Sequence, residues 1–136
     1  QPLPMSLEGA HRRALLWLRQ AQDDLRAARV LQDAGQAAQA CFLAHQVGEK
    51  ALKALLAAQD RDLRSHSITA LLRELGGDLG QRWQRQARVL DKLYAPTRYP
   101  DALGDEVPAD VFGPEDGEAA LQAATELLEW ANNSLR

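Results

Sequence analysis

Apolar residues recur three and four residues apart along most of the chain, and this spacing predicts helices rather than strands. No segment shows the alternation of apolar and polar residues that is typical of a half-buried strand. Capping residues, glycines and prolines divide the pattern into five helical segments. These segments are about Ser6–Asp33, Gln36–Gln59, a short helix to Leu75 capped by Ser65 or Ser67, Leu79–Tyr94 and Pro114–Leu135. The pattern predicts an all-α protein, an antiparallel up-and-down helical bundle of about five helices, in a single domain over residues 1–136.

The second predicted helix carries mostly small side chains on its apolar stripe. The stripe consists of Ala37, Ala40, Cys41, Ala44, Val47, Gly48, Ala51, Leu52 and Leu55. Small side chains let a neighbouring helix approach closely, so we expect either the most buried helix of the bundle or a dimer contact. Gly48 within a helix costs about 1 kcal/mol relative to alanine, and close packing around it would offset that cost.

The segment 95–113 breaks the helical pattern with three prolines and two glycines. A loop of this length is uncommon in a small domain and is usually functional or mobile. The charge also changes here. Residues 61–98 hold eight Lys and Arg against four Asp and Glu, whereas residues 99–136 hold one against nine. This asymmetry predicts either one basic and one acidic face or ordinary solvated helix surfaces.

Composition limits the compartment and the chemistry. Cys41 is the only cysteine, so an internal disulfide is excluded, and its place in an apolar stripe favours packing over catalysis. The sequence contains no apolar run long enough to span a membrane and does not start like a secretory signal. We therefore expect a cytoplasmic protein without membrane contact. Residues 1–5 are expected to be disordered or left over from cloning.

The three histidines do not form a metal-binding pattern. None of His11, His45 and His66 lies three or four residues from another, so no pair shares a helical face. The sequence also lacks a glycine-rich phosphate loop and a Gly-x-Ser-x-Gly nucleophile motif. We expect neither a metal nor a cofactor.

Two polar segments are candidates for a site. On the second helix, Gln46, Glu49, Lys50 and Lys53 adjoin the small-residue stripe. They predict either a ligand surface or a solvated face with a Glu49–Lys53 ion pair.

The second segment is Tyr94-Ala95-Pro96-Thr97-Arg98-Tyr99-Pro100-Asp101. Arginine offers a fork of donors to phosphate, tyrosine offers a stacking face to a base, and the two prolines restrict the chain. The alternative is a structural turn in which Arg98 pairs with Asp101.

Four segments in order resemble the HEPN family, the higher-eukaryote and prokaryote nucleotide-binding domain. They are Trp17-x3-Ala21-x2-Asp24-Leu25, then Gln46-x2-Glu49-Lys50-Ala51-Leu52-Lys53-Ala54-Leu55, then His66-Ser67-Ile68 with Leu71-Leu72, and finally Tyr94-x3-Arg98-Tyr99-Pro100-Asp101. The resemblance implies a helical bundle that is usually a homodimer. It also implies a gene often placed beside a minimal nucleotidyltransferase, the two forming a toxin–antitoxin pair.

Many members of this family are metal-independent ribonucleases with an arginine followed, four to six residues later, by a histidine near the start of the helix after the central loop. Arg98 matches the arginine, but no histidine follows it in the sequence. Arg61-x4-His66 has the bare spacing in an earlier connection, where the family does not place its site. We therefore expect little or no nuclease activity, and Arg98, His45 and His66 are the candidates should a catalytic site exist.

Our leading hypothesis is a HEPN-like module that binds a nucleotide, RNA or a partner enzyme. Among its candidate binding residues, Lys50, Lys53 and Arg98 would neutralise phosphate. Tyr94 and Tyr99 would stack on a base. Gln46, Glu49 and Asp101 would orient these groups or read base edges. The alternatives are a ribonuclease toxin with a diverged site and a structural dimerisation domain.

Overall fold

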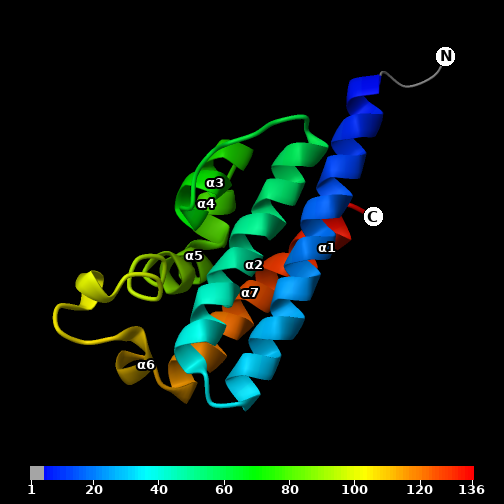
Figure 1. The fold of residues 1–136 in the computed structure, drawn as a ribbon. Coiled ribbons are helices and arrows are strands. Elements are labelled where there is room, and N and C mark those ends of the chain that lie inside the picture. Colours follow the sequence, from blue (N-terminus) through cyan, green and yellow to red (C-terminus); the bar gives the residue numbers. More distant parts are fainter. Residues whose placement is uncertain (1–4) are drawn as a thin grey trace.

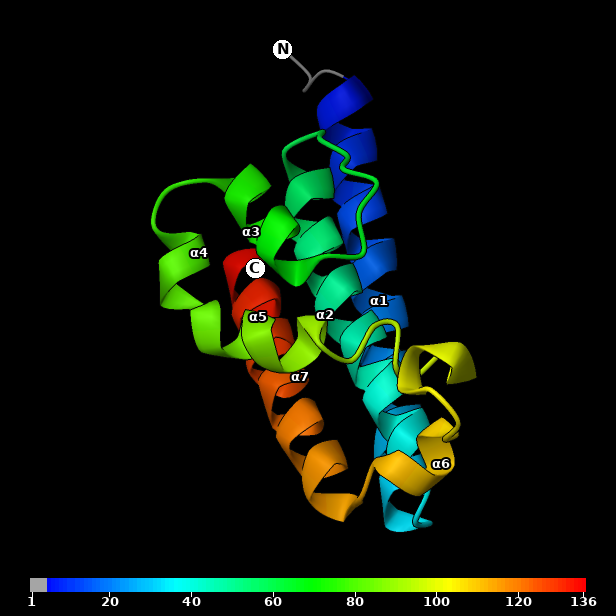
Figure 2. The same ribbon diagram turned by 90° about the vertical axis from the view of Figure 1, so that its left-hand side faces the viewer.

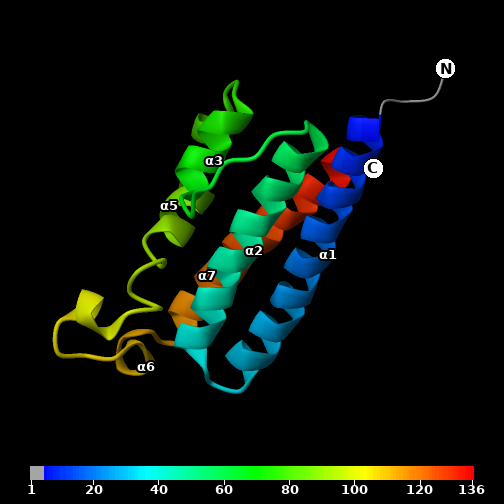
Figure 3. The same ribbon diagram turned by 45° about the horizontal axis from the view of Figure 1, so that its top comes forward.

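Three long helices frame the molecule (Figure 1). The structure is a computed structural model that describes residues 5–136. The frame consists of α1 (Met5–Asp33), α2 (Ala37–Ala58) and α7 (Pro114–Ser134). α1 and α2 run antiparallel around a tight turn in which Gly35 has φ +81°, and α7 lies against both and runs in the direction of α2 (Figures 1 and 3).

Short helices complete the fold between α2 and α7. They are α3 (Ile68–Leu75), α4 (Leu79–Arg82), α5 (Gln84–Asp91), the 3-10 helix η1 (Pro100–Leu103) and α6 (Pro108–Val111). Figure 2 shows α3, α4 and α5 on one side of α2 and α7, whereas α6 lies beside the N-terminal end of α2. None of the helices in residues 5–136 combines the length and apolar character needed to cross a bilayer.

The prediction of an all-α helical bundle is confirmed, with differences in detail. α1 begins at Met5, which we had placed in the preceding segment, and the expectation for residues 1–4 lies outside the described residues. The predicted fourth helix breaks at Trp83, where the backbone leaves the helical region (φ −105°, ψ 18°) and the indole lies 5.0 Å from the ring of Trp130. The segment 95–113, predicted as a loop, contains η1 and α6.

α2 is the interior helix of the bundle. It contacts α1, α3, α5, α6 and α7, and fifteen of its 22 residues are buried. The small residues Ala40, Cys41, Ala44, Val47 and Ala51 are fully buried within the monomer. Of the two alternatives for this stripe, burial is therefore correct, and the stripe offers no surface for a dimer contact.

Gly48 marks the point where three other helices approach α2 most closely. A Cβ atom at this position would lie 2.7 Å from Cδ1 of Leu90 on α5 and 3.3 Å from Cδ1 of Ile68 on α3. It would also lie 3.5 Å from Cδ1 of Leu127 on α7. All three leucine and isoleucine side chains are fully buried, so they have little room to move.

We predict that Gly48→Ala lowers the free energy of unfolding by about 1 kcal/mol. Overpacking a buried site costs about 1–3 kcal/mol, and the better helix propensity of alanine recovers only part of that. Urea denaturation would measure the change. Gly80→Ala in α4 is the matched control, because a Cβ there meets no atom within 4 Å and the substitution should be neutral or stabilising. A stabilised Gly48→Ala variant would contradict the close approach.

Candidate functional site

A helix cap holds the segment before α3, which carries His66, next to the segment after α5, which carries Tyr94. Asp91, the last residue of α5, accepts hydrogen bonds from the backbone N–H of Ile68 (2.6 Å) and of Thr69 (3.1 Å), and from the hydroxyl of Thr69 (2.7 Å). A carboxylate at a helix N-terminus satisfies unpaired N–H groups and complements the helix dipole. This cap ties the start of α3 to the end of α5, so His66 and Tyr94, just outside the two helices, become neighbours.

Tyr94 is the centre of an aromatic and basic cluster. The His66 ring stacks on it with centroids 4.7 Å apart and planes 19° apart. The His45 ring of α2 lies 5.2 Å away in a tilted arrangement. The guanidinium carbon of Arg98 lies 4.0 Å from the centroid of the Tyr94 ring. Three segments distant in sequence therefore meet at one tyrosine.

The Arg98 guanidinium is held between two rings. Its carbon lies 4.3 Å from the centroid of Phe42 on α2 as well as 4.0 Å from that of Tyr94, and one of its nitrogens donates to the carbonyl of Tyr94 at 2.9 Å. Cation–π contacts of this kind fix the group without neutralising its charge. The alternative for this segment, a structural turn in which Arg98 pairs with Asp101, is not what the structure shows: Asp101 is exposed and Arg98 stacks on Tyr94 and Phe42 instead.

Glu49 links the cluster to α2. Its Oε1 lies 2.9 Å from Nδ1 of His66, and its Oε2 accepts a hydrogen bond from Lys53 Nζ at 2.9 Å. The Glu49–Lys53 pair considered in the sequence analysis is present, but the residue Glu49 is only 5% exposed, so this is not a solvated face. Burial by itself would raise the pKa of Glu49, but the hydrogen bonds from Lys53 and His66 outweigh it and hold the pKa below its ordinary value.

The two histidines near Tyr94 differ in exposure and in bonding. The side chain of His66 is 58% exposed, and its Nδ1 faces Glu49. His45 is fully buried, and its Nε2 lies 2.8 Å from the carbonyl oxygen of His66. Since a carbonyl can only accept, this nitrogen carries the hydrogen. Burial lowers the pKa of His45 below its ordinary value, although the hydrogen bond to the His66 carbonyl acts in the opposite direction. His45 is therefore a neutral residue that holds the backbone of His66 in place.

The remaining candidate residues lie around this cluster or apart from it. Lys50 lies on another side of α2, where its Nζ pairs with Asp24 of α1 at 2.5 Å. Gln46 is half-buried on α2. Tyr99 is 50% exposed at the start of η1. Lys50, which we expected to neutralise phosphate together with Lys53 and Arg98, instead forms a salt bridge between α1 and α2.

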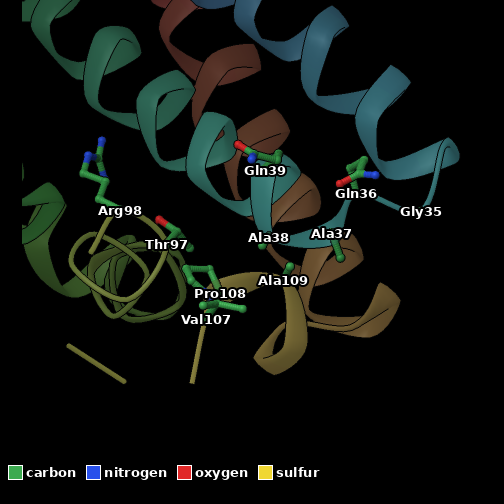
Figure 4. A pocket seen from close by; sticks show the side chains of 10 residues that line it. All are labelled: Gly35, Gln36, Ala37, Ala38, Gln39, Thr97, Arg98, Val107, Pro108 and Ala109. Atoms are coloured by element: carbon green, nitrogen blue, oxygen red, sulfur yellow. The ribbon is translucent and has the colours of Figure 1, made fainter. Parts of the chain in front are cut away.

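A groove of about 460 Å³ adjoins Arg98 (Figure 4). One wall is the N-terminal turn of α2, from Gln36 to Gln39, where the side chain of Gln36 makes no capping hydrogen bond. The opposite wall is Val107, Pro108 and Ala109 at α6, and Thr97 and Arg98 close one end. The groove thus connects the stacked arginine with the positive end of a long helix dipole.

The HEPN domain family model matches residues 14–134 of the sequence. The chain belongs to the HEPN family. Crystal structures of two relatives agree with this assignment. TT1696 from Thermus thermophilus is 39% identical with a TM-score of 0.84, and the match covers 89% of this chain and 97% of that one. ST0689, an archaeal HEPN homologue, is 34% identical with a TM-score of 0.78, and the match covers 91% of this chain and 98% of that one.

A more distant HEPN domain protein, tm0613 from Thermotoga maritima, shares the fold at 23% identity and a TM-score of 0.69, with 88% and 96% of the two chains covered. No functionally curated protein matches the sequence. The resemblance inferred from four sequence segments is therefore confirmed at the level of the family.

Sequence reasoning missed two residues that shape the site in this HEPN protein. Phe42 forms one face of the Arg98 clamp, but an aromatic residue on an interior helix is normally interpreted as core. Asp91 caps α3 across a gap of 22 residues, and no local motif marks such a long-range cap. Helical spacing could have pointed to Phe42. It lies seven residues before Glu49, and Glu49 lies four residues before Lys53, so the three residues lie along one side of α2.

We predict that Glu49→Gln lowers the free energy of unfolding at pH 7 by about 2–3 kcal/mol, because Lys53 and His66 lose a charged partner inside the fold. A carboxylate with a lowered pKa stabilises the folded state above its unfolded pKa, and this contribution is lost as the pH falls through the folded pKa. The difference between variant and wild type should therefore be smaller at an acid pH below the ordinary pKa of glutamate than at pH 7.

Urea unfolding at both pH values would measure this difference. Glu118→Gln is the control, because Glu118 is exposed on α7 and should show little difference at either pH. A difference for Glu49→Gln that stays the same at low pH would mean that the ionised carboxylate is not what stabilises the cluster.

Proposed function

We propose that this HEPN protein binds a nucleotide or RNA at the cluster of Arg98, Tyr94 and His66. The observation that carries the proposal is the Arg98 guanidinium, which is held between two aromatic rings while no carboxylate in the described residues pairs with it. An arginine fixed in this way keeps its positive charge and several N–H donors for a phosphate group.

The surroundings of Arg98 suit the other parts of a nucleotide. The ring of His66 stacks on Tyr94 and is otherwise exposed, so it offers a stacking face for a base. The groove beside the N-terminal turn of α2 offers space and a favourable dipole for further negative charge. Lys53 and Lys50 contribute less than the sequence suggested, because Glu49 and Asp24 already neutralise them.

We predict that Arg98→Ala weakens the binding of a fluorescein-labelled single-stranded RNA by about 1.5–3 kcal/mol, or roughly 10- to 150-fold in Kd, because a charge-assisted contact is lost. Arg98→Lys should also weaken binding, since an ammonium neither forks to phosphate nor stacks on Phe42 and Tyr94 in the same way. Fluorescence anisotropy at low salt would measure both effects.

Arg12→Ala is the matched control for this experiment, because Arg12 is an exposed arginine on α1. It removes the same charge from the protein and should change the affinity little. Equal losses for Arg98→Ala and Arg12→Ala would show that net charge, and not the clamped guanidinium, determines binding, and the proposal would then be wrong.

A second candidate function is metal-independent cleavage of RNA, and the contact between Glu49 and His66 favours it. A carboxylate that accepts the Nδ1 hydrogen of a histidine leaves Nε2 as an acceptor, which is the arrangement required of a general base. His66 would take the proton of a 2′-hydroxyl while Arg98 stabilises the phosphate. His45, the other candidate base, is buried and its Nε2 is already bonded.

The leading proposal predicts little or no cleavage by the protein alone. The test compares wild type with His45→Ala, His66→Ala and Arg98→Ala on single-stranded RNA and tRNA, after contaminating nucleases are removed. Robust cleavage by wild type that disappears in His66→Ala and Arg98→Ala would make the second candidate correct. Cleavage that all three variants retain would indicate a contaminant or another site.

The family assignment also supports proposals about partners. We propose that the protein forms a homodimer, works in the cytoplasm and pairs with a minimal nucleotidyltransferase in a toxin–antitoxin-type system. Because the stripe of α2 is internal, a dimer would use other apolar residues, and Leu16 and Val30 on α1 are 61% and 67% exposed. A neighbouring gene for a small nucleotidyltransferase would support the pairing. The remaining alternative is a dimerisation domain without a ligand. Absence of RNA binding by the wild-type protein would favour this alternative.

A further inference from the structure

Exposed basic side chains follow the outer side of α4 and α5. Arg82 lies in α4, and Arg85, Arg88 and Lys92 follow along α5 and its C-terminal cap; all four are exposed. The last three are three and four residues apart, so they share one face of the helix. The opposite face of α5 buries Gln86, Ala87 and Leu90. We refer to Arg82, Arg85, Arg88 and Lys92 as the basic strip.

The fold neutralises little of this charge. Arg85 has Glu126 of α7 at 3.8 Å, a long contact on a side chain that is 69% exposed. Arg88 and Lys92 form no ion pair with any residue that the structure describes. Asp91 lies between them in sequence, but both of its oxygens are used by the N-terminus of α3.

Aromatic contacts orient Arg82 without reducing its charge. Its guanidinium carbon lies 5.7 Å from the ring centroid of Trp83 and 6.0 Å from that of Trp130. Like Arg88 and Lys92, Arg82 forms no ion pair with a carboxylate of the described residues. The strip as a whole therefore keeps a net positive charge.

The strip ends at the candidate site. Lys92 is two residues before Tyr94, whose ring stacks on His66. At 1.5 Å per residue, Arg85 to Lys92 spans about 10 Å, a length that covers two to three phosphates of a nucleic-acid strand. A row of cations close to the exposed ring of His66 is the combination that single-stranded nucleic acids require, since phosphates and bases are bound at the same time. An acidic protein surface would use the cations but not the stacked rings.

We propose that the ligand is a single-stranded nucleic acid of several nucleotides, bound with one base at Tyr94 and His66 and with neighbouring phosphates along the basic strip. This inference rests on the function proposed above for Tyr94 and Arg98. It adds that a free mononucleotide or dinucleotide occupies only part of the binding surface.

The test compares labelled oligouridylates, a dinucleotide and an octanucleotide, by fluorescence anisotropy over about 50 to 200 mM salt. The octanucleotide should bind more tightly than the dinucleotide. Log affinity for the octanucleotide falls with log salt. In the double variant Arg88→Gln with Lys92→Gln, the slope of this dependence should become less steep by about 1.4, which is about 0.7 for each lost phosphate contact. Dinucleotide binding should be almost unchanged.

The matched control is Arg12→Gln with Arg19→Gln, which removes two exposed arginines from α1 and should leave the salt slope unchanged. Circular dichroism establishes that both double variants are folded. If the octanucleotide binds no more tightly than the dinucleotide and the two double variants behave alike, the strip is not a ligand surface, while binding at Arg98 still stands.

Two further outcomes would also overturn the inference. Failure of both oligonucleotides to bind at low salt removes the proposed function and the strip together. A strip variant that binds both oligonucleotides like wild type but loses self-association in sedimentation would show that the strip holds a second copy of the chain.

Discussion

The packing of α2 against five other helices is the constraint from which the site follows. Polar side chains on the buried part of such a helix need hydrogen-bond partners inside the protein. α2 carries two such residues at its centre, His45 and Glu49. His45 donates to the backbone of His66, and Glu49 takes hydrogen bonds from Lys53 and His66. Packing thus fixes the connection between α2 and α3 at one position beside Tyr94.

A site built in this way is organised before a ligand arrives. The Asp91 cap holds the ends of α3 and α5 together, the polar residues of α2 hold His66, and the rings of Phe42 and Tyr94 hold Arg98. Side chains that are already ordered lose less entropy on binding, so a few contacts can supply useful affinity. In the proposed function, the outward-facing atoms of His66 and Arg98 are the groups that contact the ligand.

Much of the fold could be predicted from the sequence because its signals are local. Of the two serines that could cap α3, Ser65 and Ser67, it is Ser67 whose hydroxyl accepts from the N–H of Ala70, and the Glu49–Lys53 pair follows from helical spacing alone. The break at Trp83 could not be predicted, because it accompanies packing against Trp130 in the distant α7. Lys50 was misplaced for a related reason: helical position shows which side chains adjoin, but not that Asp24 lies opposite. The contact between His66 and Glu49 could not be predicted either, because it joins two segments that are distant in sequence.

We propose that His66, Tyr94 and Arg98 form one ligand surface to which Lys50 does not belong. NMR titration with uridine 5′-monophosphate tests it most directly, by following assigned side-chain signals as the ligand is added. The signals of the His66 and Tyr94 rings and of the Arg98 guanidinium should shift together with one dissociation constant, while those of Lys50 and the Trp130 indole stay unchanged. Shifts confined to other surfaces, or shifts at Lys50 without any at Arg98, would contradict it.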